Sequence, residues 1–402
     1  MRASGRSRLD SPGRLGPDIG MSLTRRAFLV AAPTLFLAPA LRAADSPMRA
    51  AVIGHTGRGD FGHGLDAIFL KRPGIEVVGV ADPDPLGRAR VAAALGGVAA
   101  HADWRAMLAK ERPQLVSIAM RHADEHAAIA IACLEAGAHV YLEKPFVRSP
   151  DEADAVLAAA ARHRRRVAVA HGMRMAPVVQ RLRQEVAGGL IGELREMRAH
   201  GKQDARAGGE DMMVLGSHLF DLMRAFAGEA RSCSARVLQG GRDITANDRR
   251  QVKDSVGWVA GDQVDARFAF DHGVHASFTS DSRLKETAGH WGIELHGSRG
   301  VARIHCDLSP RAFVRTGPGW NVAGPDNPWK AFEPRMATPE AECIRIPATD
   351  WMEAVAADRE PECSGRNGAA AVEMVMAVYH AALRRAWVDL PLGRREHPLG
   401  SA

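Results

Sequence analysis

Between residues 49 and 171, short apolar segments alternate with segments of helical periodicity. Strands are predicted at 49–54, 75–81, 114–119, 138–142 and 166–171, and helices at about 60–70, 123–136 and 150–163. Apolar runs separated by helices are typical of parallel strands that are covered on both faces. The pattern therefore predicts a doubly wound parallel sheet over residues 48–170.

After residue 190 the apolar positions recur with period two. Residues 264–270 and 274–278 alternate in this way, and Asp271-His272-Gly273 forms a turn between them. Such alternation predicts antiparallel strands with one covered face. A helix is predicted at 369–386. We expect residues 171–402 to form a second α/β domain with an open, mainly antiparallel sheet, and the last helix to pack back on the first domain.

Residues 1–45 are predicted to be a leader. The segment from Thr24 to Leu29 contains Arg25 and Arg26 and resembles a twin-arginine export signal. The apolar run that follows ends at Leu41 after about 15 residues, whereas a membrane span needs about 20. We therefore expect export to the periplasm or the medium without a stable membrane span.

Charge and cysteine content exclude several classes of protein. The net charge is +6, but seven arginines and two aspartates give residues 1–43 +5, which leaves 46 basic and 45 acidic residues, or +1, in the rest. Nothing in that balance indicates a nucleic-acid partner. The five cysteines are scattered, with no C-x-x-C spacing and no neighbouring histidine cluster, so neither a disulfide framework nor a metal site is predicted.

A glycine-rich turn follows the first predicted strand. Two registers remain open: Gly54, Thr56 and Gly59 keep the usual distance from the strand, whereas Gly57, Gly59 and Gly62 fit the letter pattern but begin later. Glycines let a backbone approach a pyrophosphate closely. The dinucleotide-binding residues predicted in this turn are Gly54, Thr56, Gly57, Arg58 and Gly59.

Asp82 ends the second predicted strand, at the position where an acid that binds the cofactor ribose is expected. A carboxylate there accepts a hydrogen bond from the 2′-hydroxyl and repels a 2′-phosphate. The residue therefore favours NAD over NADP. The alternative is a helix N-cap before Pro83.

Glu143-Lys144-Pro145 ends the strand predicted at 138–142. Pro145 biases Lys144 toward an extended conformation, which holds its ammonium at the carboxyl edge of the sheet. Ligands of open α/β sheets bind at that edge. An amine there can polarise a hydroxyl group or accept its proton.

The chain from residue 49 onward resembles the glucose–fructose oxidoreductase and inositol dehydrogenase family (Gfo/Idh/MocA). The most specific matches are Glu143-Lys144-Pro145 with the helix before it, which includes His126, and Gly216-Ser217-His218-Leu219-Phe220-Asp221, which fits the family pattern G-x-H-x-x-D. The resemblance implies a Rossmann domain, NAD(P)-linked chemistry on sugars or polyols, and a homo-oligomer, a dimer or tetramer, formed through the second sheet. It implies catalytic roles for Lys144 and His218, with Asp221 beside them, and places Glu143 and His126 on the cofactor side.

One position departs from the family pattern. Many members have an aspartate four residues before the catalytic histidine, where this chain has Val214. The usual Asp–His proton relay is therefore incomplete. Asp211, seven residues before His218, or Glu210 is the candidate replacement, because two helical turns would place it on a similar face.

Three functions follow from these features. The first is an exported sugar or polyol oxidoreductase with tightly held NAD, since the periplasm offers no free nicotinamide pool. The second is an NAD-assisted glycoside-cleaving enzyme of the same family. The third, suggested by Val214 alone, is a degenerate nucleotide- or sugar-binding protein.

Overall fold

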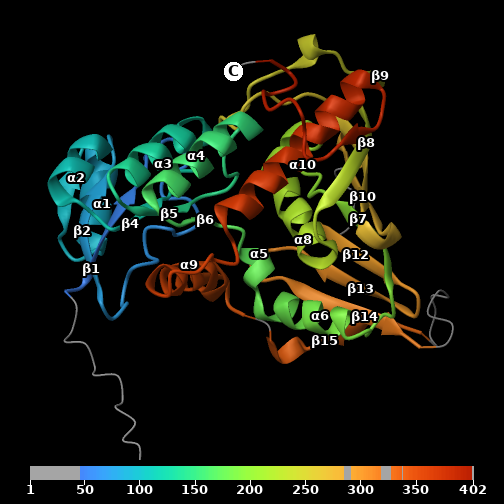
Figure 1. Cartoon of the computed structure of the whole chain (residues 1–402), viewed down its shortest axis with the longest axis horizontal. Helices are drawn as coiled ribbons and strands as arrows, with labels where there is room; N and C mark the ends of the chain where they lie inside the picture. The colour runs from blue at the N-terminus through green and yellow to red at the C-terminus, as the bar shows by residue number, and fades with distance from the viewer. Residues whose placement is uncertain (1–45, 285–290, 318–326, 337, 401–402) are drawn as a thin grey trace, which may run out of the picture. The chain divides into compact units, whose positions relative to one another are not determined.

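A six-stranded parallel sheet forms the first half of the fold (Figure 1). The computed structural model describes residues 46–284, 291–317, 327–336 and 338–400. The strands are β1 (Met48–Ile53), β2 (Ile75–Ala81), β3 (Ala99–His101), β4 (Leu115–Ile118), β5 (His139–Leu142) and β6 (Val167–Val169). Their order is β3-β2-β1-β4-β5-β6, which is the Rossmann order and confirms the predicted doubly wound sheet. The leader predicted at 1–45 lies outside the described residues.

Helices cover both faces of this sheet. One face packs against α2 (Trp104–Glu111), α3 (His126–Glu135) and α4 (Pro150–His163), and the other against α1 (Pro85–Ala94). The second face is completed from far along the chain by α9 (Glu340–Ala356), whose fully buried Trp351 lies 5.6 Å from Tyr141 and 6.2 Å from Phe69 between ring centres. The core of the first domain therefore includes residues of the second half of the sequence.

The prediction of a helix at 60–70 is wrong. The segment is a series of turns, although Phe61, Leu65, Ile68 and Phe69 are buried against the sheet as an amphipathic helix would be. Asp60, Gly62 and Gly64 have positive φ values of 51°, 61° and 82°, which no right-handed helix accommodates. The glycine-rich turn is thus not followed by a helix N-terminus.

The second sheet has ten strands in the order β15-β14-β13-β12-β7-β11-β10-β8-β16, with β9 paired to β8. All neighbours are antiparallel except β7 and β11. The predicted hairpin is present as β10 (Gln263–Phe270) and β11 (His275–Asp281) around the turn Asp271–Gly273. The other strands are β7 (Leu194–His200), β8 (Ala230–Gln239), β9 (Arg242–Asp243), β12 (Gly292–Gly297), β13 (Gly300–His305), β14 (Arg311–Thr316), β15 (Lys330–Phe332) and β16 (Val388–Asp389).

Helix α10 (Gly365–Arg384) links this sheet to the first domain, and α8 (Ser217–Ala227) packs on α10 and β7 (Figure 1). Helix α10 packs on α8 and β8, and also on α4 and β6. Its Gly368 lies so close to Val169 and Phe146 that a Cβ would stand 2.6 Å from a Val169 methyl group. Two further helices, α5 (Gly172–Met175) and α6 (Pro177–Ala187), follow β6. No helix of the described ranges is long and apolar enough to cross a membrane.

The turns that replace the predicted helix supply a matched pair of substitutions. A Cβ at Gly62 would stand 2.5 Å from the carbonyl oxygen of Ala119, whereas nothing lies within 4 Å of one at Gly64. Both glycines have positive φ. We predict that Gly64→Ala lowers the free energy of unfolding by about 1 kcal/mol and Gly62→Ala by about 2–4 kcal/mol, because only the second adds overlap with backbone. Denaturant unfolding measures both, and equal losses would contradict this account.

Candidate active site

A cavity of about 210 Å³ lies at the carboxyl edge of the parallel sheet, between the two sheets. Its walls come from the segment after β1, the end of β5, the start of α8 and Trp291, which directly precedes β12. The charged and aromatic side chains that line it are His63, Arg121, Tyr141, Glu143, Lys144, Lys202, Arg206, His218, Asp254, Trp291 and Asp307. Lys144 and His218, which lie 74 positions apart in the sequence, thus face one space.

Lys144 is buried at the end of β5, with 8 % of its surface exposed. Its Nζ atom donates a hydrogen bond of 3.3 Å to the carbonyl oxygen of Val214. Burial lowers the pKa of the ammonium, and the charge of the neighbouring Glu143 opposes that effect. A lysine with one hydrogen bond and a lowered pKa is suited to donate to, or take a proton from, a hydroxyl in the cavity.

Glu143 is buried beside it and accepts a hydrogen bond of 2.7 Å from His63 Nδ1. Burial would raise the pKa of Glu143, but the hydrogen bond and charge of His63, together with the charge of Lys144, lower it. The carboxylate is therefore charged at neutral pH and partly balances the buried ammonium.

His218 lies in the first turn of α8 with 8 % of its surface exposed. Its Nδ1 atom is fully enclosed and has no hydrogen-bond partner in the described parts of the chain. Because His218 lines the cavity, Nε2 is the nitrogen left to face it. Burial, and secondarily the charge of Lys144, holds the pKa of His218 well below its usual range. The imidazole is thus a neutral base at physiological pH.

The glycine-rich turn is held by the carboxylate of Asp82. Asp82 is fully buried and accepts hydrogen bonds from Thr56 N (3.1 Å), Thr56 Oγ1 (2.6 Å) and Asp84 N (2.9 Å). The carboxylate therefore joins the turn to the start of α1, and its contact with the cofactor ribose stays a prediction. The alternative N-cap role belongs to another residue, since Asp84 caps α1 through a hydrogen bond from Gly87 N.

Two further residues predicted on the cofactor side are engaged with the protein itself. Arg58 pairs with Asp124 at 2.5 Å and Glu125 at 3.0 Å. His126 is fully buried, and its ring nitrogens face the carbonyl oxygens of Met120 (2.8 Å) and Pro145 (3.0 Å). His126 therefore braces the backbone that follows Lys144 and does not reach the cavity.

The turn retains features that fit the phosphates of NAD. Gly57 is exposed, has a φ of 84° and has nothing within 4 Å of a Cβ position. Its amide donates a hydrogen bond of 3.3 Å to the exposed carboxylate of Asp60, so the turn already binds an anionic oxygen. A bound phosphate would replace that carboxylate at Gly57 and at Gly59, two residues further on. Gly54 is buried against Phe61 and serves the packing of the turn.

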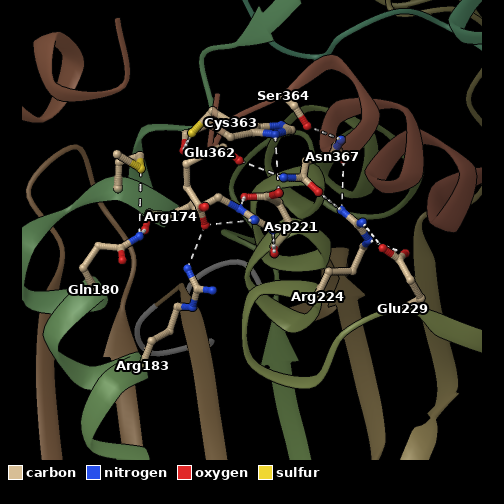
Figure 2. A network of polar contacts seen from close by, with 12 residues as sticks. Arg174, Gln180, Arg183, Asp221, Arg224, Glu229, Glu362, Cys363, Ser364 and Asn367 are labelled. Carbon is tan, nitrogen blue, oxygen red and sulfur yellow. Dashed lines mark hydrogen bonds and ion pairs between the residues drawn. The ribbon is translucent and has the colours of Figure 1, made fainter. Parts of the chain in front are cut away.

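Asp221 lies on α8 but is not among the residues that line the cavity. Figure 2 shows it beside Arg174 in a network of polar contacts. Arg174 Nε donates to its Oδ2 atom at 2.9 Å, and Arg174 Nη2 donates to its backbone oxygen at 3.1 Å. Both side chains are almost completely buried. The direct catalytic role predicted for Asp221 is corrected: its carboxylate does not touch the cavity.

The prediction that Asp211 replaces the aspartate expected at position 214 as the relay partner of His218 is wrong. Its carboxylate accepts hydrogen bonds from Lys202 N (3.2 Å), Gln203 N (3.0 Å) and Ser280 Oγ (2.7 Å), not from His218. Residues 212–216 form a π-helix, which winds more residues per turn than an α-helix, so the expected two-turn spacing does not hold. Glu210 instead pairs with Arg250 at 3.3 Å.

Several site residues escaped the sequence interpretation. His63 holds Glu143, and Arg121, Asp254 and Trp291 line the cavity. His171 is buried beside His218, with 5.4 Å between the ring centres. It follows β6 by two residues, and this place at the carboxyl edge of a parallel sheet is the signal that could have identified it. Among the described residues, no group of acidic, histidine and cysteine side chains forms a metal site.

Two family models match this chain. Residues 48–171 match "Oxidoreductase family, NAD-binding Rossmann fold", and residues 195–390 match "Oxidoreductase family, C-terminal alpha/beta domain". Both belong to Gfo/Idh/MocA.

Curated relatives include sugar and glycoside dehydrogenases. Levoglucosan dehydrogenase of Pseudarthrobacter phenanthrenivorans is 24% identical over 78% of this chain and 89% of its own length. D-glucoside 3-dehydrogenase of Escherichia coli is 30% identical over 44% of this chain and 53% of its own length. Among solved structures, levoglucosan dehydrogenase in complex with NADH and levoglucosan superposes with a TM-score of 0.68 at 22% identity, covering 86% of this chain and all of the other. At that identity the likeness shows the fold.

We predict a structural effect for Asp211→Ala. It leaves the backbone amides of Lys202 and Gln203, the second of them buried, and Ser280 Oγ without their acceptor, which lowers the free energy of unfolding by about 1–3 kcal/mol. Because Lys202 and Arg206 line the cavity, KM rises, whereas the acid limb of the pH profile of kcat/KM stays in place. Ser280→Ala, which removes one of these hydrogen bonds, is the matched control. If the acid limb of the kcat/KM profile moved in Asp211→Ala but not in Ser280→Ala, Asp211 would act as a proton relay and this account would be wrong.

Proposed function

Since the chain belongs to the Gfo/Idh/MocA family of NAD-binding oxidoreductases, we propose that it oxidises a secondary or anomeric hydroxyl group of a sugar, polyol or sugar derivative. The single observation that carries this proposal is the convergence of two buried bases, Lys144 and His218, on one cavity at the carboxyl edge of the sheet. The names of the relatives, which are dehydrogenases of levoglucosan, D-glucosides and D-apiose, support the substrate class.

The chemistry divides between cofactor and protein. NAD, when bound, accepts the hydride from the carbon atom. The protein must take the proton of the hydroxyl group, and His218 is neutral and able to do so because burial lowers its pKa. Lys144 donates a hydrogen bond to the same oxygen and stabilises negative charge on it as the proton leaves. Glu143 keeps this ammonium close to electrical balance in the enclosed site.

The remaining lining suits a polyhydroxylated ligand. Arg121, Lys202, Arg206, Asp254 and Asp307 offer charged donors and acceptors around the cavity, and Trp291 lies with its ring centre 6.0 Å from that of His218. An aromatic ring with a few convergent polar groups is typical of a small-molecule site. Hydroxyl groups of a sugar would hydrogen-bond to this rim, and the apolar face of its ring would lie against Trp291.

We predict that the purified protein forms NADH from NAD⁺ with levoglucosan, D-apiose or a D-glucoside such as methyl β-D-glucoside, because its relatives are named as dehydrogenases of levoglucosan, D-apiose and D-glucosides. Lys144→Met and His218→Asn should each lower kcat by about 10²–10⁴-fold, since each removes a group that assists proton transfer. Absorbance of NADH measures turnover, and calorimetric titration with NAD⁺ shows whether each variant still binds the cofactor.

Different results in the same assays would favour the glycoside-cleaving enzyme or the degenerate binding protein. Release of nitrophenol from a nitrophenyl glycoside, with NAD bound and no net NADH, would identify an NAD-assisted glycoside-cleaving enzyme. Absence of bound nucleotide in the purified protein, together with absence of NAD⁺ binding on titration, would reject both enzymes and leave a degenerate binding protein. Full activity in Lys144→Met and His218→Asn would reject the assignment of the two bases.

We extend the proposal to twin-arginine export of the folded protein with NAD already bound. All five cysteines are free and buried, so folding before export requires no disulfide. An enzyme of the periplasm must retain its cofactor and reduce it and oxidise it in place, with a second sugar or carbonyl compound as the partner substrate. Assembly as a dimer or tetramer through the open sheet, measurable by light scattering, completes the proposal.

Export is tested by the position of the arginine pair. We expect a reporter fused to residues 1–45 to reach the periplasm, and the double change Arg25→Lys and Arg26→Lys to keep it in the cytoplasm, because the export machinery reads the pair rather than its charge. Arg14→Lys, outside the motif, is the control. Equal periplasmic fractions for the two altered fusions would contradict twin-arginine export.

A further inference from the structure

A group of buried polar atoms without partners lies behind His218. Both ring nitrogens of His171, Nδ1 of His218 and Oδ1 of Asp221 are enclosed and have no hydrogen-bond partner in the part of the chain that the structure describes. Buried polar atoms are almost always hydrogen-bonded, because leaving one unpaired costs about 1–3 kcal/mol. Four such atoms on three adjacent residues therefore require an explanation.

The three residues are arranged in a row. The rings of His218 and His171 meet edge to face with 5.4 Å between their centres and 65° between their planes. His171 Nδ1 lies 3.9 Å from Asp221 Oδ1. Two imidazoles joined by a hydrogen bond of about 2.9 Å have ring centres roughly 5 Å apart. Small side-chain rotations would thus complete a row from His218 through His171 to Asp221.

The far end of the row is fixed. Arg174 occupies Asp221 Oδ2 and the backbone oxygen of Asp221, so Oδ1 is the oxygen that remains for His171. Arg174 is itself held by Glu362 at 3.4 Å, and Arg183 reaches the same carboxylate at 2.8 Å (Figure 2). Cys363 Sγ donates to the backbone oxygen of His171 at 3.4 Å. Asp221 is therefore a rigid carboxylate that can orient a neighbouring ring.

We propose that His171 and Asp221 position and polarise His218, in place of the carboxylate that is absent at Val214. The proposal rests on the function proposed above, in which His218 takes the substrate proton. His171 Nδ1–H donates to Asp221 Oδ1, which leaves His171 Nε2 to accept from His218 Nδ1–H. His218 Nε2 then carries its lone pair toward the cavity. His171 is a positioning residue because it acts only through His218.

The proposed step accounts for both the proton and the hydride that leave the substrate. The O–H bond of the substrate breaks as an N–H bond forms at His218 Nε2, and the two electrons of the C–H bond pass as hydride to NAD⁺, which is reduced. The positive charge that arises on His218 is stabilised by the hydrogen bond from Nδ1–H to His171 and by the carboxylate beyond it. No proton need leave the row during the step, and the proton on Nε2 returns to solvent after product release.

The charged groups around the row decide whether removal of His171 raises or lowers the pKa of His218. Those that act on His218 are Lys144, His171 and His63, and those that act on His171 are Asp221, Arg174, Lys144 and Glu143. Arg206, Lys202, Arg121, Asp254 and Asp307 face the cavity as well. If His171 were only a neighbouring cation, its removal would raise the pKa of His218. If His171 stabilises the imidazolium, its removal lowers that pKa.

Two substitutions at position 171 separate hydrogen bonding from packing. His171→Phe keeps a ring but removes acceptor and donor, whereas His171→Gln keeps an amide oxygen toward His218 and an amide N–H toward Asp221. With levoglucosan or methyl β-D-glucoside, whichever is turned over, we expect kcat to fall about 10–100-fold in His171→Phe, as for outer partners of other catalytic groups, and less in His171→Gln. In His171→Phe the acid limb of the pH profile of kcat/KM should move to lower pH, and NAD⁺ affinity should stay within about twofold, because the row does not contact the cofactor turn.

His380→Asn is the matched control, since His380 lies on α10 and its Nε2 atom also has no partner in the described structure. It should leave kcat and the acid limb unchanged. An acid limb in His171→Phe that is unmoved or moves to higher pH would overturn the relay. So would equal losses of kcat in His171→Phe and His171→Gln, which would indicate packing alone.

Nitrogen-15 NMR of the wild-type imidazoles, with NAD⁺ bound, provides a readout that requires neither substrate nor variant. The relay requires the Nδ1–H tautomer at both His171 and His218. An Nε2–H tautomer at His218 would overturn the relay even in an active enzyme. Conversely, both Nδ1–H tautomers in a protein that oxidises none of the sugars would support the arrangement and reject the proposed substrate class.

Discussion

The site depends on an ammonium group removed from water at the point where the two sheets meet. Lys144 lies two residues after β5 of the first sheet, and its Nζ atom reaches the carbonyl oxygen of Val214 in the second domain. Transferring an ammonium out of water costs several kcal/mol unless an opposite charge lies near it. Glu143, held by His63, supplies that charge. The pair fixes the carboxyl edge of the sheet, and the cavity forms around the free side of the ammonium.

The second domain meets this edge with an interrupted helix. Residues 212–216 are wound as a π-helix before α8 begins, and they present both the Val214 carbonyl and His218 to the cavity. The same winding turns Asp211 away to hold the loop that contains Lys202 and Arg206. An aspartate that the family pattern places at position 214 is thus replaced by a histidine and an aspartate that lie in other parts of the sequence, 171 and 221. The hydrogen-bonding partner that His218 lacks at position 214 is therefore supplied by His171 and Asp221.

Much of this arrangement was predictable, and the exceptions have physical causes. The sheet and the β10–β11 hairpin follow from periodicity, whereas the joint roles of Lys144 and His218 follow from the family resemblance that two local motifs carry. The helix at 60–70 was predicted from buried apolar positions, but positive φ at Asp60, Gly62 and Gly64 outweighs that pattern. His126 was predicted on the cofactor side because position alone does not show which partners a side chain has. His171 acts through residues almost 50 positions away, and no local pattern reports such a contact.

The account makes one central claim, that Lys144 and His218 together receive the reacting hydroxyl group. A crystal structure with NAD⁺ and levoglucosan, or methyl β-D-glucoside if that is the substrate turned over, tests it most directly. The account predicts that one hydroxyl oxygen of the sugar lies about 3 Å from both Lys144 Nζ and His218 Nε2, with the carbon that bears it facing the nicotinamide. A sugar held by Lys202 and Arg206 with its hydroxyl groups turned away from Lys144 and His218 would contradict it.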